Sequence, residues 1–243
     1  MTVALVLLAL LVAGGAVVAV GAATPRLAAL GMFIALVGSA YVADPLPGTL
    51  ALAVRLVGST LGAYLVWIAL RGAPAHIPGI SVAWPGALAV AGVAFVAGWL
   101  AAGSLGETLA AVSGDGPGLS AVGAALATGS PVARAALGAA LALAAVAVTP
   151  VVMARDLLRT RIGLLLLLAS ATLLRNALGT SPDPVFELGV AVLTAASGAA
   201  IGAVIASSLR RTGDLVLSDS FRRDVLVRHR AADDAHLDGD GAR

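Results

Sequence analysis

The sequence predicts an all-α polytopic membrane protein with about seven transmembrane helices, and three observations support this. The chain is 60% hydrophobic over 243 residues, with a mean hydropathy of +1.01. Only 12% of its residues are charged, and they fall mainly between long uncharged stretches. A bilayer core about 30 Å thick requires about 20 mostly apolar residues per helix, whose backbone polar groups must be paired internally. The stretches without Asp, Glu, Lys or Arg are residues 2–25, 27–43, 56–70, 77–106, 135–154, 162–174 and 188–209.

The boundaries of the helices follow from local chemistry. The segment Asp44-Pro45-Leu46-Pro47 breaks the chain before the third span, and Pro182-Asp183-Pro184 breaks it before the seventh. Ser130-Pro131 is typical of an N-cap followed by proline at the first helical position. The sixth span has a short uncharged core, so Arg161 and Arg175 are expected to extend toward opposite interfaces. The predicted spans are 3–22, 27–43, 48–70, 84–104, 132–153, 161–178 and 186–209.

The distribution of arginine predicts the orientation. Every second gap between the spans is rich in arginine, and cytoplasmic loops carry an excess of basic residues. This places the N-terminus outside and the C-terminus in the cytoplasm, in a multi-pass protein of the plasma membrane. Arg134 and Arg175 are exceptions near outer ends. The arginine-rich gaps contain Arg26, then Arg71, then Arg155, Arg159 and Arg161, and finally Arg210 and Arg211.

The chain divides into a membrane domain, residues 1–211, and a tail, residues 212–243. The tail is dense in charge and is expected to be cytoplasmic and largely disordered. Within the membrane domain, residues 1–72 and 131–211 show a similar order of helices, basic turn and Asp-Pro break. The Asp-Pro breaks are spaced 139 residues apart. This pattern suggests two three-helix units around a central helix at 84–104.

Composition argues against several functional classes. The chain has no cysteine and three scattered histidines, so no metal site or bound cofactor is expected. The net charge of +2 is spread over short gaps, which argues against nucleic-acid binding. No nucleotide loop, catalytic triad or paired carboxylate is recognisable. We therefore expect no catalytic residues, no enzymatic activity, and the lipid bilayer as the surrounding medium.

Charges within the spans are the first candidates for function in a membrane protein. Arg55 is the deepest, eight residues after Pro47. It could lie on an ion path, or it could reach the headgroups or a neighbouring protein. No carboxylate is expected at its depth within this chain. Glu187 lies in the first turn of the seventh span, where it complements the helix dipole, and it could pair with Arg175.

Small residues at helical spacing predict close helix packing. Gly58 and Gly62 form a G-x-x-x-G motif in the third span, and Gly198 and Gly202 form another in the seventh. Such motifs allow two helix backbones to approach closely.

The last spans carry a family resemblance. Residues 155–168, from Arg155-Asp-Leu-Leu-Arg to the five leucines, resemble the basic turn and second helix of NADH-quinone oxidoreductase subunit K. Residues 192–202, before Arg210-Arg211, resemble its third helix. The run 184–190, Pro-Val-Phe-Glu-Leu-Gly-Val, is similar to the final helix of hydrogenase-4 component E. The corresponding small protein of Mrp-type cation/proton antiporters belongs to the same group. The resemblance is clearest over residues 132–211.

The resemblance implies a function and also a departure from the group. Subunit K carries a glutamate in the middle of its second and third helices, and those carboxylates belong to the proton path. The matching positions here are Leu165 and Gly198. The expected function is a non-catalytic membrane subunit of a multisubunit ion-translocating complex, either a respiratory NADH dehydrogenase, a membrane hydrogenase or an Mrp-type antiporter. Other membrane subunits would then be its partners, and Arg55 would contact a carboxylate on one of them. The alternative is a stand-alone small transporter or a structural membrane protein. A transport cavity would draw on Ser39, Ser59, Thr60, Tyr64, Ser170 and Thr172.

Overall fold

The computed structural model describes residues 2–43, 49–72, 84–112, 130–153, 157–178 and 184–212, and these residues are entirely helical apart from their ends. The tail predicted at 212–243 and both Asp-Pro breaks lie essentially outside the described residues. The helices are α1 (Thr2–Gly21), α2 (Pro25–Ala43), α3 (Thr49–Ala69), the 3₁₀ turn η1 (Leu70–Gly72), α4 (Trp84–Val112), α6 (Pro131–Met153), α7 (Leu157–Ala177) and α8 (Pro184–Thr212). The prediction of an all-helical membrane protein is confirmed at this level.

Three helices, α2, α6 and α8, begin with proline. Proline is favoured at the first helical position because its missing N–H would have no partner there. At α6 the backbone N–H of Arg134 donates to the carbonyl of Ser130 at 3.1 Å, which closes the first turn over Pro131. These starts explain why the predicted and observed boundaries agree closely.

Six of the seven described α-helices, all except α7, are long and apolar enough to span a membrane. The exception is 21 residues long, but Arg159, Arg161 and Arg175 reduce its apolar character. It lies between α6, α2, α8 and α1, and Leu158, Leu165 and Leu166 are buried on it. A helix covered largely by protein can tolerate charges that a lipid-exposed helix cannot.

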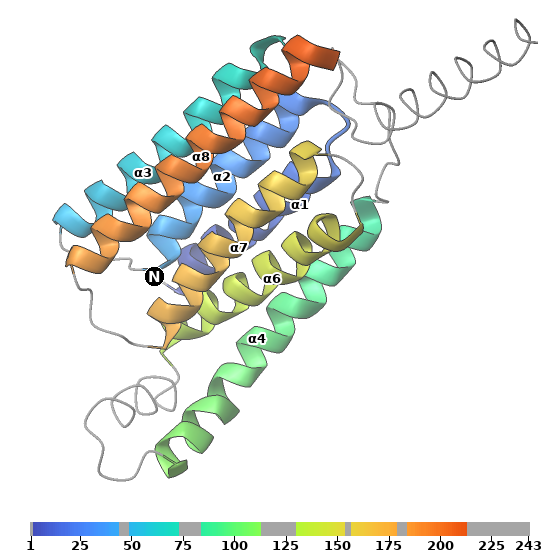
Figure 1. Ribbon diagram of the computed structural model, residues 1–243. Helices are drawn as coiled ribbons and strands as arrows, with labels where there is room; N and C mark the ends of the chain where they lie inside the picture. Colours follow the sequence, from blue (N-terminus) through green and yellow to red (C-terminus); the bar gives the residue numbers. More distant parts are fainter. Residues whose placement is uncertain are drawn as a thin grey trace, which may run out of the picture.

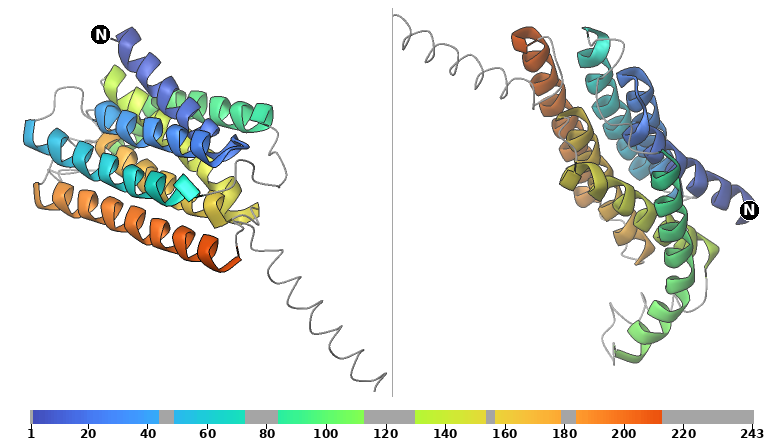
Figure 2. Two further views of the ribbon diagram at one scale, coloured as in Figure 1. Left: turned by 90° about the horizontal axis from the view of Figure 1, so that it is seen from above. Right: turned by 90° about the vertical axis from the view of Figure 1, so that its right-hand side faces the viewer.

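Consecutive helices run in alternating directions, and α3 and α8 lie side by side along one edge of the bundle (Figure 1). Along the other edge, α4 packs mainly against α6 and to a lesser extent against α1. Figure 2 shows the same arrangement from two further sides. The helix expected at the centre of two units is therefore peripheral, because the interior is already filled by α1, α2, α6 and α7.

The two predicted three-helix units pack helix against counterpart. In this arrangement α1 contacts α6, α2 contacts α7, and α3 contacts α8. All three pairs run in parallel, as two units related by an axis along the helices would require.

Glycine contacts show the residue equivalence between the units. A Cβ at Gly31 would meet Gly15 O at 2.6 Å and Ala19 N at 2.5 Å. A Cβ at Gly163 would meet Ala147 O at 2.8 Å, with Val151 nearby. Each residue of the second set follows its counterpart by 132 positions. The spacing of 139 suggested by the Asp-Pro breaks therefore does not describe the helix packing, because the loops before α3 and α8 differ in length.

The helices differ in how far the bundle covers them. For α3 and α4, 22% of the apolar window is buried, against 61% for α2 and α6. Large apolar side chains such as Val57, Val93 and Leu100 are exposed on the peripheral helices. In a membrane these faces contact lipid or other proteins, and the interior consists largely of alanine, which allows close helix packing.

Candidate functional site: an ion pair between parallel helices

The close contact between α3 and α8 sets the geometry of the site. A Cβ at Gly58 would lie 2.8 Å from Ala191, and one at Gly198 would lie 2.5 Å from Gly62 Cα. One turn further along, Gly202 faces the Leu65 carbonyl, at 3.1 Å from a Cβ. Both G-x-x-x-G motifs thus lie in one interface, and only residues without a side chain fit this backbone separation.

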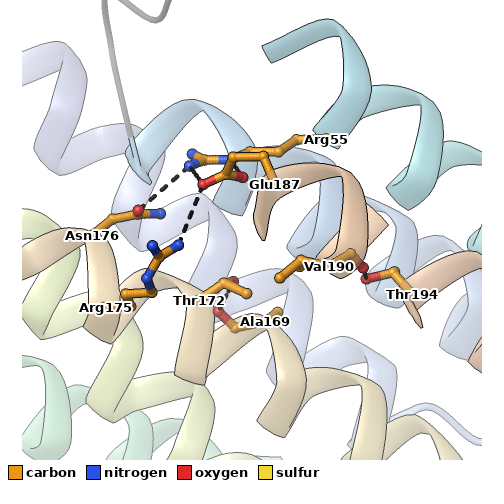
Figure 3. A network of polar contacts seen from close by, with 8 residues as sticks. All are labelled: Arg55, Ala169, Thr172, Arg175, Asn176, Glu187, Val190 and Thr194. Atoms are coloured by element: carbon orange, nitrogen blue, oxygen red, sulfur yellow. Dashed lines mark hydrogen bonds and ion pairs between the residues drawn. The ribbon is translucent and has the colours of Figure 1, made fainter. Parts of the chain in front are cut away.

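The register of that interface brings Arg55 and Glu187 together. Arg55 lies one turn before Gly58, and Glu187 lies one turn before Ala191, so their side chains meet at the same level. Nε of Arg55 donates to Oε2 of Glu187, and Nη2 donates to Oε1 (Figure 3). This two-pronged arrangement is the strongest geometry for an arginine–carboxylate pair. The side chains are 12% and 5% exposed, respectively.

The end of α7 completes the network. Nη2 of Arg55 also donates to Oδ1 of Asn176 at 3.4 Å, and Nη1 of Arg175 lies 3.8 Å from Oε1 of Glu187. The Arg175 guanidinium stacks over the Phe186 ring at 3.4 Å from its centroid, a favourable cation–π contact. Glu187 at the start of α8 and Arg175 at the end of α7 both complement their helix dipoles. The network links three helices.

Two sequence-based expectations about Arg55 are wrong. We expected its partner on another protein and no carboxylate at its depth, but Glu187 of the same chain fills that role. Positions within each helix suggested different depths, since Arg55 is more than one turn into α3 and Glu187 is in the first turn of α8. The packing register of α3 against α8, which the sequence does not show, offsets the two helices. The expected approach of Arg175 to Glu187 is present as the longer of the two contacts.

Asn176 and Phe186 belong to the network but were not among the sequence candidates. Each is adjacent in sequence to a charged candidate, Arg175 or Glu187. Their proximity to these charges was the only available signal, because a single amide or phenyl group at a helix end is common.

A small cavity lies beside the ion pair. Its volume is about 40 Å³, and the side chains of Ser39, Ser59, Thr172 and Thr194 line it together with Arg55 and Glu187. Three of these hydroxyls donate to carbonyls of their own helices, at 2.7 Å from Ser39, 2.7 Å from Thr172 and 2.8 Å from Thr194. A water needs at least about 10–15 Å³, whereas sites for small organic molecules span about 300–1,000 Å³. The cavity therefore has room for water.

The remaining polar candidates lie elsewhere. Ser170 Oγ donates to the Ala140 carbonyl at 2.7 Å, which links α7 to α6. Thr60 and Tyr64 line a separate groove on the outer surface of α2 and α3. The structure thus brings three of the six proposed transport residues, Ser39, Ser59 and Thr172, to one cavity.

The chain matches no protein-family model, and neither the curated proteins nor the solved structures compared with it show significant similarity. The resemblance to subunit K therefore remains a prediction. Its two departures can be placed in the fold. Leu165 is 1% exposed in the core, and Gly198 lies against the backbone of Gly62.

The charges of the described residues are divided unevenly between the two ends of the bundle. We call the end at which α2, α4 and α7 begin the basic end. Its described side chains include five arginines: Arg26, Arg71, Arg159, Arg161 and Arg210. The carboxylates in the described ranges, Glu107 and Glu187, both lie toward the opposite end, with Arg55, Arg134 and Arg175. In the same ranges, no three His, Cys, Asp or Glu side chains are grouped as a metal site would require.

Proposed function

We propose that this chain is a non-catalytic membrane subunit that helps to hold together a multisubunit ion-translocating complex. The observation that carries the proposal is the closure of the Arg55–Glu187 network within the chain. A charge on an ion path needs a partner to exchange with along that path. Here the deepest arginine holds its carboxylate with both prongs, and Asn176 and Arg175 occupy the flanks. The network acts as a lock between α3, α7 and α8.

The two positions that would carry protons in the subunit K group support this interpretation. A carboxylate at position 198 has no space, because a Cβ there would lie 2.5 Å from Gly62 Cα. Position 165 is an apolar side chain packed in the core. The proposed subunit therefore keeps helices of this kind for packing beside antiporter-like neighbours, and the neighbours carry the protons.

The proposed topology has seven spans, with α7 as the seventh, in the plasma membrane. The excess of arginine at the basic end favours a cytoplasmic location for that end. This orientation puts the N-terminus and the Arg55–Glu187 pair toward the outside, and the C-terminus in the cytoplasm.

One observation favours the second candidate, a stand-alone transporter. Some transporters are built from parallel repeats about an axis along the membrane normal, with the substrate site between the repeats. The pairing of α1–α3 with α6–α8 has this form. The cavity between the units measures about 40 Å³, so a transported organic molecule would require a much wider conformation.

The test is a mild-detergent pull-down of the tagged chain from its native membrane, followed by quantitative mass spectrometry. The proposal predicts antiporter-like or quinone-reductase subunits at near-equal stoichiometry. An unrelated multi-pass protein carrying the same tag is the control for non-specific capture. Recovery of the chain alone, or only as a homo-oligomer, would contradict the proposal and favour the transporter.

A further inference from the structure

An apolar groove runs along the outer surface between α2 and α3. It has a volume of about 250 Å³ and is lined by Ala29, Leu30, Phe33, Thr60, Ala63, Tyr64 and Trp67. We call it the α2–α3 groove. Three of the nine aromatic residues of the chain lie here, and Phe33, Tyr64 and Trp67 are 39%, 53% and 38% exposed. The groove therefore offers large aromatic surfaces to whatever surrounds the bundle.

Two arginines continue the groove toward the basic end. On α2, Arg26 precedes Ala29 and Leu30 by one turn and Phe33 by two, so these residues share one helical stripe. On the other wall, Arg71 in η1 follows Trp67 by four residues and continues the stripe of Thr60, Ala63 and Tyr64. Both arginines are exposed. The antiparallel course of α2 and α3 places both at the same end of the groove.

The charge at this end of the groove is unbalanced. The carboxylates in the described ranges, Glu107 and Glu187, lie toward the opposite end of the bundle. No hydrogen bond or ion pair joins Arg26 or Arg71 to another described residue. An anion bound there would meet two guanidinium groups, each suited to hold phosphate oxygens with paired hydrogen bonds.

We propose that the α2–α3 groove binds an anionic phospholipid, with its phosphate at Arg26 and Arg71 and one acyl chain along Phe33, Tyr64 and Trp67. Basic pockets between transmembrane helices bind anionic headgroups, and tyrosine and tryptophan are favoured near the membrane interface. From Thr60 to Trp67 the helix rises about 10 Å, roughly a third of the hydrocarbon core. The groove thus holds the part of the acyl chain nearest the headgroup. The site is independent of whether the chain belongs to a complex.

The experiment uses the fluorescence of Trp67 in the full chain with Trp84→Phe and Trp99→Phe. The protein is reconstituted into phosphatidylcholine vesicles that contain increasing fractions of brominated phosphatidylglycerol, and in a parallel series brominated phosphatidylcholine. Bromine quenches only a tryptophan that it approaches closely, so the two curves give the relative affinity of the groove for the anionic lipid. Each arginine near a headgroup contributes about a fivefold preference. The proposal predicts stronger quenching by the anionic lipid.

Matched variants identify the source of any preference. Arg26→Gln with Arg71→Gln should bring the two quenching curves together, whereas Arg210→Gln, at the same end on α8, should leave the preference intact. An equal loss in Arg210→Gln would assign the effect to general surface charge and overturn the site. Equal quenching by both lipids in the parent protein would also overturn it. Protection of Trp67 from both brominated lipids would show that a protein surface covers the groove instead.

Discussion

The lock between α3 and α8 predicts a large energetic coupling between Arg55 and Glu187. Replacing Glu187 by leucine leaves the Arg55 guanidinium, 12% exposed, with Asn176 at 3.4 Å as its remaining described contact. Removing one partner of a buried pair costs about 3–5 kcal/mol of unfolding free energy, because the other charge remains buried. Replacing Arg55 by leucine should cost less, about 2–3 kcal/mol, since Arg175 remains 3.8 Å from Glu187.

The double variant, Arg55→Leu with Glu187→Leu, should recover much of this loss. It removes both charges together, and well-packed apolar replacements of buried pairs are often close to neutral. The expected coupling between the two positions is therefore about 2–4 kcal/mol. It can be measured as a double-mutant cycle from reversible SDS-titrated unfolding in mixed micelles.

A control cycle combines Glu187→Leu with Arg26→Leu, which lies at the basic end, far from the pair. The two changes should be additive within about 0.5 kcal/mol. The lock is refuted if the Arg55–Glu187 coupling is no larger than this control value. It is also refuted if Arg55→Leu proves more destabilising than Glu187→Leu.

Two further predictions concern packing. Gly198→Ala should destabilise the chain by about 1–3 kcal/mol, because its Cβ would meet Gly62 Cα at 2.5 Å. Gly189→Ala on the same helix has nothing within 4 Å and should instead stabilise by up to about 1 kcal/mol, so equal effects in SDS unfolding would contradict the α3–α8 register. Ser170→Ala should cost about 0.6–1.7 kcal/mol, because it removes the 2.7 Å bond from α7 to the Ala140 carbonyl. Ser207→Ala, whose hydroxyl bonds within its own helix, should be nearly neutral in the same assay, and a larger loss there than at Ser170 would count against the link.

The sequence contained enough information for the helices and their class. Uncharged stretches longer than a bilayer span leave few alternatives to a helix, and prolines at 25, 131 and 184 mark where three helices begin. The glycine motifs indicated that α3 and α8 carry close-packing faces. The sequence did not show that the two motifs face each other, because a motif specifies a face and not its partner.

The pairing of charges was beyond sequence reasoning for a related reason. The partner of Arg55 lies 132 residues away, and its depth depends on the offset between two parallel helices. That offset is set by backbone contacts such as Gly58 with Ala191. The position of α4 could not be predicted either, since an apolar helix of uniform character has no face that identifies its neighbours. The groove between α2 and α3 needed the antiparallel register that brings Arg26 and Arg71 to one end.

The most direct test of the proposed scaffold compares partner capture by charge variants in native membranes. Arg55→Glu places two carboxylates together and should open the lock, whereas Arg55→Glu with Glu187→Arg restores an ion pair of opposite direction. We predict that partner subunits co-purify with the parent chain and with the exchanged pair, but are reduced at least severalfold with Arg55→Glu alone. Full capture by Arg55→Glu would contradict the scaffold role of the lock. Loss of capture by a stable exchanged pair would also contradict it, since Arg55 would then itself contact a partner.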